Sequence, residues 1–358
     1  MKTLINELKK IDGVKICMEY IDSKLNVKKC INGKTVDRIF SFFKLYFDVK
    51  DNWQPDSIAS LYFFKYSLFE KNIRERCNSR VLHKDIRVSS AKEFNLSIEQ
   101  YLIDEYYVYD YIQNDTAILI DYKNLDILIF MGSSSEIAVV EFLRDIVIKD
   151  QENKGSIVLH AAAVEKNGRV IAIAGRKGAG KSTAMMELIL NGGYHFFSGD
   201  KLIARVSNEE IIVKGWPDYP HIGVGTISRY KVLIDTFFEY DFNNMDSQEK
   251  IILDFEKFYG VEKLLPCNKI LNLKTILFPQ FDYRKKSLLV KEEEIADRIM
   301  SNIEYKEDFS MSQWHNIVPK SYDREKVICN FQNIISKNVY AYSWHGNFEA
   351  SLIEDLIR

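Results

Sequence analysis

The run from Gly175 to Ser182 constrains this chain more than any other feature of its sequence. Glycines let a backbone curl so that its N–H groups point at phosphate oxygens, while a lysine reaches the outer phosphates and a hydroxyl ligates Mg²⁺. The run therefore predicts a loop that binds a nucleoside triphosphate. Its residues match the pattern G-x-x-x-x-G-K-[ST] and are Gly175, Arg176, Lys177, Gly178, Ala179, Gly180, Lys181 and Ser182.

The sequence on either side fits such a loop. Apolar residues 170–174 predict a short buried strand that enters it, and residues 182–190 predict a helix that ends at Asn191, Gly192 and Gly193. Thr183 completes the expected nucleotide-binding residues, and Ser182 is the expected Mg²⁺ ligand within the loop. The alternative is a glycine-rich turn without a ligand.

Length and composition favour a folded protein of two domains. The chain has 358 residues, of which 46% are hydrophobic, enough for one large core or two ordinary ones. We expect an N-terminal α+β domain over residues 1–150, which could bind a substrate or partner, and a nucleotide-binding catalytic domain over residues 151–358. The 49 Lys and Arg residues nearly balance the 51 Asp and Glu residues, so no nucleic-acid partner is expected.

The cysteines and the apolar segments narrow the class of protein further. The five cysteines are odd in number, widely separated and without a C-x-x-C pair, which argues against a disulfide framework and a zinc site. No apolar stretch is long enough for a membrane span, and the first residues mix charged and apolar side chains. These features predict a cytoplasmic protein that does not insert into a membrane.

A hairpin precedes the glycine loop. Asn167 and Gly168 separate the apolar residues 157–164 from the strand that enters the loop, and Asn-Gly between apolar runs is a strong hairpin signal. The connection is too short for a crossover helix. We therefore expect an antiparallel partner beside the loop strand, hence a mixed sheet in an α/β fold.

Weaker patterns predict the other elements. Residues 39–47 and 61–69 are apolar segments of undetermined type, and a polar stretch at 149–155 is the expected domain boundary. Strands are expected at residues 106–112, 117–121, 126–130, 194–198, 202–206, 210–214, 274–278, 287–290 and 339–344, and helices from 136, at 292–301 and at 347–358.

Phosphoryl transfer requires a carboxylate near the phosphate loop, to hold Mg²⁺ or to orient and deprotonate an acceptor hydroxyl. Asp200 and Asp282 both end apolar strands. We favour Asp200, because it ends the first strand after the loop helix, whereas Asp282 follows a proline and precedes a basic turn. Either residue could instead simply cap its turn.

His160 interrupts the apolar strand next to the loop strand, where an unpaired imidazole would be costly. We expect it to pair with Asp200 across adjacent strands, although a satisfied core histidine is the alternative. Arg229, Arg176 and Lys177 are further candidates to balance phosphate charge.

Leu159-His160-Ala-Ala-Ala-Val, Asn167-Gly168, residues 175–183 and Ser198-Gly199-Asp200 together resemble the catalytic domain of HPr kinase/phosphorylase. The resemblance is closer to the HPr-kinase-like proteins of peptide and natural-product maturation, among them lasso-peptide kinases. It covers residues 117–358 and implies a P-loop domain of the HPr kinase/phosphoenolpyruvate carboxykinase type that phosphorylates a serine hydroxyl with ATP. It also implies that His160 supports the catalytic carboxylate.

The sequence departs from that family at two places. The family has two adjacent aspartates where this chain has Gly199 and Asp200, so one carboxylate role is missing or supplied elsewhere. The longer signature of the phosphorolysis loop and the regulatory N-terminal domain are not recognisable. Neither phosphorylase activity nor HPr as a substrate is therefore expected.

Two hypotheses from different classes follow. In the first, the protein is an ATP- and Mg²⁺-dependent kinase of a specialised biosynthetic pathway, acting on a peptide, protein serine or small-molecule hydroxyl. Lys181 binds phosphates, Ser182 and Asp200 hold Mg²⁺, Asp200 activates the acceptor, and His160 supports Asp200. In the second, the protein is a nucleotide-gated partner without an acceptor. The choice of ATP over GTP and a possible oligomer stay open.

Overall fold

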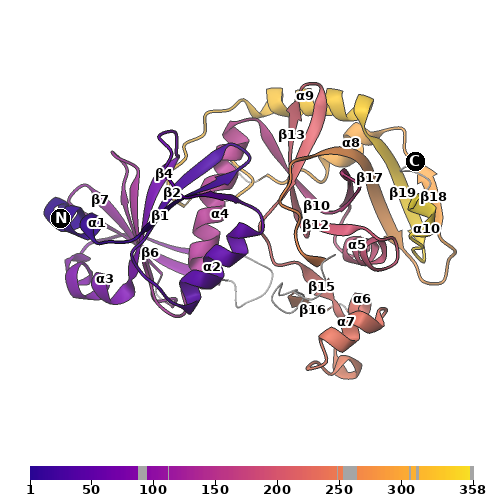
Figure 1. The fold of residues 1–358 in the computed structure, drawn as a ribbon. Helices are drawn as coiled ribbons and strands as arrows, with labels where there is room; N and C mark the ends of the chain where they lie inside the picture. Colours follow the sequence, from indigo (N-terminus) through magenta and orange to yellow (C-terminus); the bar gives the residue numbers. More distant parts are fainter. Residues whose placement is uncertain are drawn as a thin grey trace. The chain divides into compact units, whose positions relative to one another are not determined.

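The structure is a computed structural model that describes residues 1–87, 95–111, 113–247, 249–252, 264–305, 308–311 and 314–354. It divides into two compact units (Figure 1). The first contains Met1–Gln151 and Lys306–Ser321, and the second contains Glu152–Tyr305 and Tyr322–Arg358. The sequence-based division instead keeps residues 306–321 in the C-terminal domain.

The first unit is built on one sheet of nine strands in the order β3-β1-β2-β4-β9-β8-β7-β6-β5. β4 runs parallel to β2 and β9, and the other neighbours are antiparallel. Its elements are α1 (Lys2–Lys10), β1 (Val14–Tyr20), β2 (Ser23–Lys29), α2 (Lys34–Lys44), β3 (Asp48–Lys50), β4 (Ala59–Lys65), α3 (Tyr66–Asn72), η1 (Arg74–Arg76), β5 (Arg80–Arg87), β6 (Asn95–Ile103), β7 (Tyr106–Tyr111), β8 (Thr116–Asp121), β9 (Asp126–Met131) and α4 (Glu136–Asn153).

Several local predictions in this unit are confirmed. β7, β8 and β9 form the expected antiparallel meander, and every residue of β8 and β9 is buried. A helix follows Ser135, whose hydroxyl accepts a hydrogen bond from the N–H of Gly132. The two apolar segments of undetermined type contain parts of α2, and of β4 followed by α3. Ile112 lies outside the described residues.

The polar stretch at 149–155 contains the division between the two units, which falls between Gln151 and Glu152, but part of this stretch is a buried helix. α4 continues through Asn153, and Lys149 and Gln151 are fully buried in it. Lys149 donates a hydrogen bond to Asp145 one helical turn earlier, and His315 lies against the same carboxylate. These polar residues are therefore internal contacts of the first unit rather than a solvated connection.

The second unit is built on a mixed sheet, β11-β10-β13-β14-β17-β19-β18, with β12 paired to β10. β17 also pairs with β11, so the pairings close a ring of β11, β10, β13, β14 and β17. Its elements are β10 (Ser156–Lys166), β11 (Arg169–Ala174), α5 (Lys181–Leu190), β12 (His195–Ser198), β13 (Lys201–Ser207), β14 (Glu210–Gly215), β15 (His221–Gly223), α6 (Val224–Ile227), α7 (Lys231–Thr236), η3 (Phe242–Asn244), β16 (Lys250–Ile252), β17 (Leu271–Phe281), β18 (Leu288–Lys291), α8 (Ile295–Met300), α9 (Arg324–Asn338), β19 (Tyr340–Gly346) and α10 (Ser351–Glu354).

The predicted hairpin before the glycine loop is confirmed. β10 and β11 pair antiparallel, and Asn167 and Gly168 have positive φ angles of 55° and 77°, as a tight two-residue turn requires. On its other side β11 has a parallel neighbour, β17. The mixed sheet expected from the short connection is present, and the mixed α/β class is confirmed.

Alternation along β10 and β11 sorts their residues between two faces. One set, including Leu159, Ala161 and Ala172, joins a buried apolar cluster with residues of α8 and α9. His160 belongs to the alternate set, since successive strand residues point to opposite faces. α5 contacts β10, β11 and β17. The topology therefore places His160 on the face where α5 begins.

The C-terminal part of this unit differs from the sequence prediction in detail. α9 was not predicted, because only Phe331 and Ile335 of its 15 residues are buried and its apolar pattern is weak. The final helix begins at Ser351 rather than at 347, and residues 355–358 lie outside the described part of the chain. β17 and β19 form the predicted strands and run parallel.

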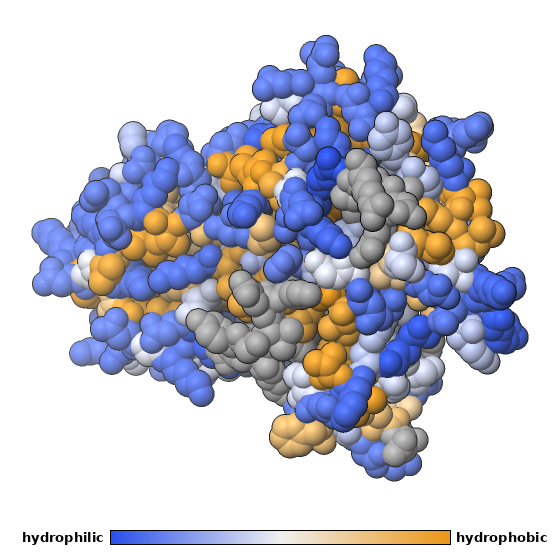
Figure 2. Space-filling model, turned by 45° about the vertical axis from the view of Figure 1, so that its right-hand side comes forward, coloured by the Kyte–Doolittle hydropathy of each residue, from blue (hydrophilic) through white to orange (hydrophobic). Residues whose placement is uncertain are grey.

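Hydrophilic residues cover much of the face drawn in Figure 2, with hydrophobic residues between them. In the part of the chain that the structure describes, no helix is both long and apolar enough to cross a membrane.

Candidate functional site

The glycine loop connects β11 to α5. Gly178 and Gly180 have φ angles of +85° and +102°, in the left-handed region that favours glycine. At Gly180 a Cβ would also lie 2.7 Å from the Cβ of Phe281, whereas at Gly178 no atom would lie within 4 Å of it. The loop is thus packed where it enters α5 and open at Gly178.

Lys181 is the first residue of α5, and its side chain folds back across the loop. Its Nζ donates a hydrogen bond to the carbonyl oxygen of Gly175 at 2.7 Å and lies 3.0 Å from Nε2 of His160. Burial lowers the pKa of Lys181, and the charge of Asp200 opposes that shift. The lysine therefore links the glycine loop to the predicted catalytic residues.

Asp200 occupies the turn between β12 and β13, both of which pair with β10. Its Oδ1 lies 3.6 Å from Nδ1 of His160, close enough for an ion pair but beyond hydrogen-bond distance. The side chain of Asp200 is 45% exposed, against 35% for His160. The structure thus brings the two residues together and leaves the carboxylate accessible.

Packing explains the glycine that precedes Asp200. A Cβ at Gly199 would lie 2.7 Å from Cγ and 2.9 Å from Cβ of Pro220, whose ring cannot move aside as a flexible side chain could. A second carboxylate at this position has no room.

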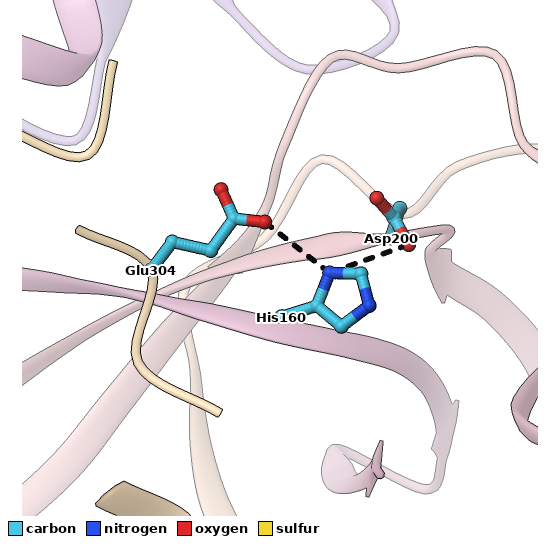
Figure 3. Close-up of side chains that lie close together, drawn as sticks. All are labelled: His160, Asp200 and Glu304. Atoms are coloured by element: carbon cyan, nitrogen blue, oxygen red, sulfur yellow. Dashed lines mark hydrogen bonds and ion pairs between the residues drawn. The ribbon is translucent and has the colours of Figure 1, made fainter. Parts of the chain in front are cut away.

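A second carboxylate that the sequence analysis missed comes from Glu304, in the segment after α8. Its Oε1 lies 3.2 Å from Nδ1 of His160 (Figure 3). Its Oε2 lies 3.4 Å from Nζ of Lys201. Burial raises the pKa of Glu304, but the contacts with His160 and Lys201 outweigh it and lower the pKa to about 2. No local motif marks this residue, which is 144 positions from its partner.

The three side chains could also hold a metal ion. One ligand atom from each of His160, Asp200 and Glu304 lies within 4.8 Å of the other two. A set of one imidazole nitrogen and two carboxylate oxygens suits a divalent cation.

The other predicted residues lie near the loop in varied settings. Arg176 and Lys177 are exposed and Ser182 is half-buried. Thr183 is buried, and its hydroxyl lies 2.8 Å from that of Thr226 in α6. Its hydroxyl is therefore engaged within the protein.

Two remaining candidates are also accounted for. The guanidinium of Arg229 lies over the ring of Phe281, 4.6 Å from its centre, and donates to Asn347 at 2.8 Å. Asp282 accepts hydrogen bonds from the backbone and the side chain of Arg284, both at 3.1 Å. Asp282 therefore caps its own turn.

Comparison with known proteins adds little. No protein-family model matches the chain, and no curated protein matches it. Among solved structures, the chain is similar to the HPr(Ser) kinase/phosphatase from Coxiella burnetii. The two share 13% sequence identity over 56% of this chain and 93% of that chain, with a TM-score of 0.26. So weak a likeness defines neither the fold nor the activity of this protein.

Proposed function

We propose that this protein is an ATP-dependent phosphotransferase that transfers the γ-phosphate to a hydroxyl group of a peptide, a protein serine or a small molecule. The observation that carries the proposal is the position of Lys181. Its ammonium contacts both the glycine loop and His160, and it lies close enough to Asp200 for that charge to affect its pKa. A phosphate-binding loop and an accessible carboxylate are the two halves that phosphoryl transfer requires.

The nucleotide half consists of the loop and the first turn of α5. The left-handed Gly178 and Gly180 direct the loop backbone, and the ten-residue helix that follows presents its N-terminal N–H groups. Lys181 would exchange its contacts with Gly175 and His160 for contacts with phosphate oxygens. ATP is thus expected to displace two hydrogen bonds of the lysine.

The residues present fit Mg²⁺, which prefers hard oxygen ligands. Ser182 follows Lys181 in the first turn of α5, and Asp200 lies close enough to Lys181 for its charge to affect the pKa of that lysine. We expect these two residues to hold the ion. When bound, it would neutralise charge on the transferring phosphate.

The acceptor half is formed by Asp200. Its accessible carboxylate is suited to accept the proton of an acceptor hydroxyl or to orient that hydroxyl for attack. The carboxylate of Asp200 lies beside the imidazole of His160, which supports the positioning role proposed for that residue.

A second candidate is a nucleotide-gated partner protein that binds or slowly hydrolyses ATP without an acceptor. It is favoured by Gly199, where Pro220 leaves no room for a second carboxylate in the turn.

The test uses the purified protein with Mg²⁺ and γ-labelled ATP in a dialysed extract supplemented with the products of neighbouring genes. A Lys181→Ala variant serves as control. Label on a peptide, protein or small molecule that disappears with the variant supports the phosphotransferase. Label recovered only as inorganic phosphate, or ATP binding without turnover, supports the gated partner instead.

A further inference from the structure

Glu304 is held in place by backbone pairing with β10. The N–H of His160 donates to the carbonyl of Asn302 at 2.7 Å, and the N–H of Glu304 donates to the carbonyl of Val158 at 2.8 Å. Leu159 and Ile303 form an antiparallel bridge between these two hydrogen bonds. The segment therefore pairs with the edge of β10 through a single β-bridge. This pairing fixes the side chain of Glu304 next to the imidazole of His160.

The two carboxylates are not equivalent partners of His160. Both approach Nδ1, as the dashed lines in Figure 3 show, but Glu304 is at 3.2 Å and Asp200 at 3.6 Å. Only the shorter of these distances is compatible with a hydrogen bond. Glu304 is also less exposed, at 24% against 45% for Asp200. The closer and more buried carboxylate thus holds the ring.

The contact with Lys181 shows which ring nitrogen carries the proton in this structure. A charged ammonium group only donates hydrogen bonds, so Nε2 of His160 must accept from Nζ at 3.0 Å. A neutral imidazole has one N–H, which then sits on Nδ1 and points towards Glu304. The same arrangement disfavours a metal ion on Nδ1, because that nitrogen has no lone pair to offer in this tautomer.

We propose that Glu304 is a positioning residue for the site: it holds His160 with Nδ1 protonated and the lone pair of Nε2 directed at the phosphate loop, and leaves Asp200 for the acceptor and Mg²⁺. The effect on turnover rests on the proposed function, but the position of the proton does not.

Lys201 stabilises this arrangement from the other side. Its Nζ lies 3.4 Å from Oε2 of Glu304, and it is paired with His160 in the register of β10 and β13. Each oxygen of the carboxylate therefore has its own partner. The pair keeps Glu304 ionised, in agreement with its lowered pKa of about 2.

The proton can be located by NMR on protein with ¹⁵N-labelled histidine rings, because the two neutral tautomers give different nitrogen shifts. The signals of His160 are assigned with His160→Gln. Lys181→Ala is used as the background, so that the carboxylates alone hold the ring and no nucleotide is needed. In this background we expect Nδ1 of His160 to stay protonated. We expect the same when Asp200→Ala is added to Lys181→Ala.

Adding Glu304→Ala to the same background is expected to shift the proton towards Nε2, whereas Glu304→Gln, which keeps an acceptor oxygen, retains it on Nδ1. Glu210→Ala is the matched control, since Glu210 pairs with Lys274 away from the site. Loss of the Nδ1 proton with Asp200→Ala, or none with Glu304→Ala, overturns the proposal.

Turnover gives an independent readout once an acceptor is known. Glu304→Ala should lower kcat about 10- to 100-fold with the KM for ATP changed by less than about threefold, and Glu304→Gln should recover most of the loss. If the proton on His160 moves when Glu304 is substituted but the protein has no transfer activity, the proposed function alone is contradicted. If the protein has transfer activity but the proton on His160 does not move when Glu304 is substituted, this inference alone is contradicted.

Discussion

Each unit of the molecule contains a cluster of a histidine, a lysine and a carboxylate, but the two clusters differ in exposure. In the first unit, Asp145 lies 2.7 Å from Nζ of Lys149 and 2.6 Å from Nε2 of His315, and the three side chains are 0–1% exposed. In the second unit, the side chains of His160, Asp200 and Glu304 are 24–45% exposed.

The buried cluster is closed to solvent. The carboxylate of Asp145 faces both Lys149 and His315, and burial lowers the pKa of His315 against the opposing charge of Asp145. Its ring nitrogen Nδ1 also accepts from the N–H of Ile317 at 3.4 Å, so both nitrogens are occupied. This cluster ties the segment around His315 to α4 and has no face left for a ligand.

The half-exposed cluster includes a group that can exchange partners. Lys181 belongs to a glycine loop that is open at Gly178, and Asp200 is accessible. Similar residue types therefore serve different purposes: accessibility and the neighbouring loop, rather than the presence of a histidine with a carboxylate, distinguish a candidate site from an internal ion cluster.

The largest expected effect is on phosphoryl transfer. Asp200→Asn removes the proposed general base and metal ligand, so we expect transfer to fall by about 10² to 10⁴. Because Asp200 is accessible and forms no close hydrogen bond with His160, the free energy of unfolding should change by less than about 0.5 kcal/mol. Transfer rates and chemical denaturation measure the two. Transfer at the unmodified rate would show that another group activates the acceptor.

The corresponding substitution in the buried cluster should lower stability strongly and leave ATP binding unchanged. Asp145→Ala removes the carboxylate that faces Lys149 and His315, which should lower the free energy of unfolding by about 3–5 kcal/mol. Chemical denaturation measures this loss, and ATP binding well below the melting temperature should be kept.

Asp235→Ala is the control for that change. Lys231 and Asp235 also form an i,i+4 pair, in the reverse order, and their side chains are 87% and 59% exposed, so the loss of this pair should have little effect. Equal destabilisation by Asp145→Ala and Asp235→Ala would contradict the distinction between the two clusters.

Glu304 should make stability depend on pH. Its pKa is about 2 in the folded protein, below its ordinary value of 4.5, so the folded carboxylate holds a proton less tightly than the unfolded one. The resulting stabilisation is present above pH about 4.5 and is lost as the pH falls towards 2. The gap in unfolding free energy between the unmodified protein and Glu304→Gln should narrow over this range. A gap that stays constant would contradict the assigned ionisation.

A modest effect is expected at Thr183. Its hydroxyl is engaged with Thr226, so Thr183→Val should cost about 1–3 kcal/mol of unfolding free energy. If Thr183 contributes to nucleotide binding through its backbone, the affinity for Mg·ATP should stay within about threefold. Titration calorimetry measures the affinity for Mg·ATP. A much larger loss of affinity would show that the hydroxyl itself contacts the nucleotide.

The sequence predicts those parts of the fold and site that local signals encode. Asn167 and Gly168 define a hairpin because few other residues tolerate their backbone angles, and the glycines before Lys181 identify the loop by spacing alone. Asp200 could be predicted because it ends the strand that follows the loop helix.

Residues joined only by tertiary structure were not predictable in this way. Glu304 reaches His160 through a single backbone bridge with β10, and no nearby motif marks it. His315 pairs with a carboxylate 170 positions earlier, so its role depends on the packing of a whole unit. Pro220 explains Gly199 in the same way, since their contact exists only in the folded chain.

The six histidines can report on both clusters in one sample. We would record the ring nitrogens of His160 and His315 by NMR while adding Mg²⁺ and a non-hydrolysable ATP analogue. The account predicts that His160 shifts as Lys181 leaves Nε2 for the phosphates, that His315 does not, and that Lys181→Ala abolishes the response. A titration that moves neither histidine, or moves His315 and not His160, would contradict the assignment of the half-exposed cluster as the nucleotide-dependent site.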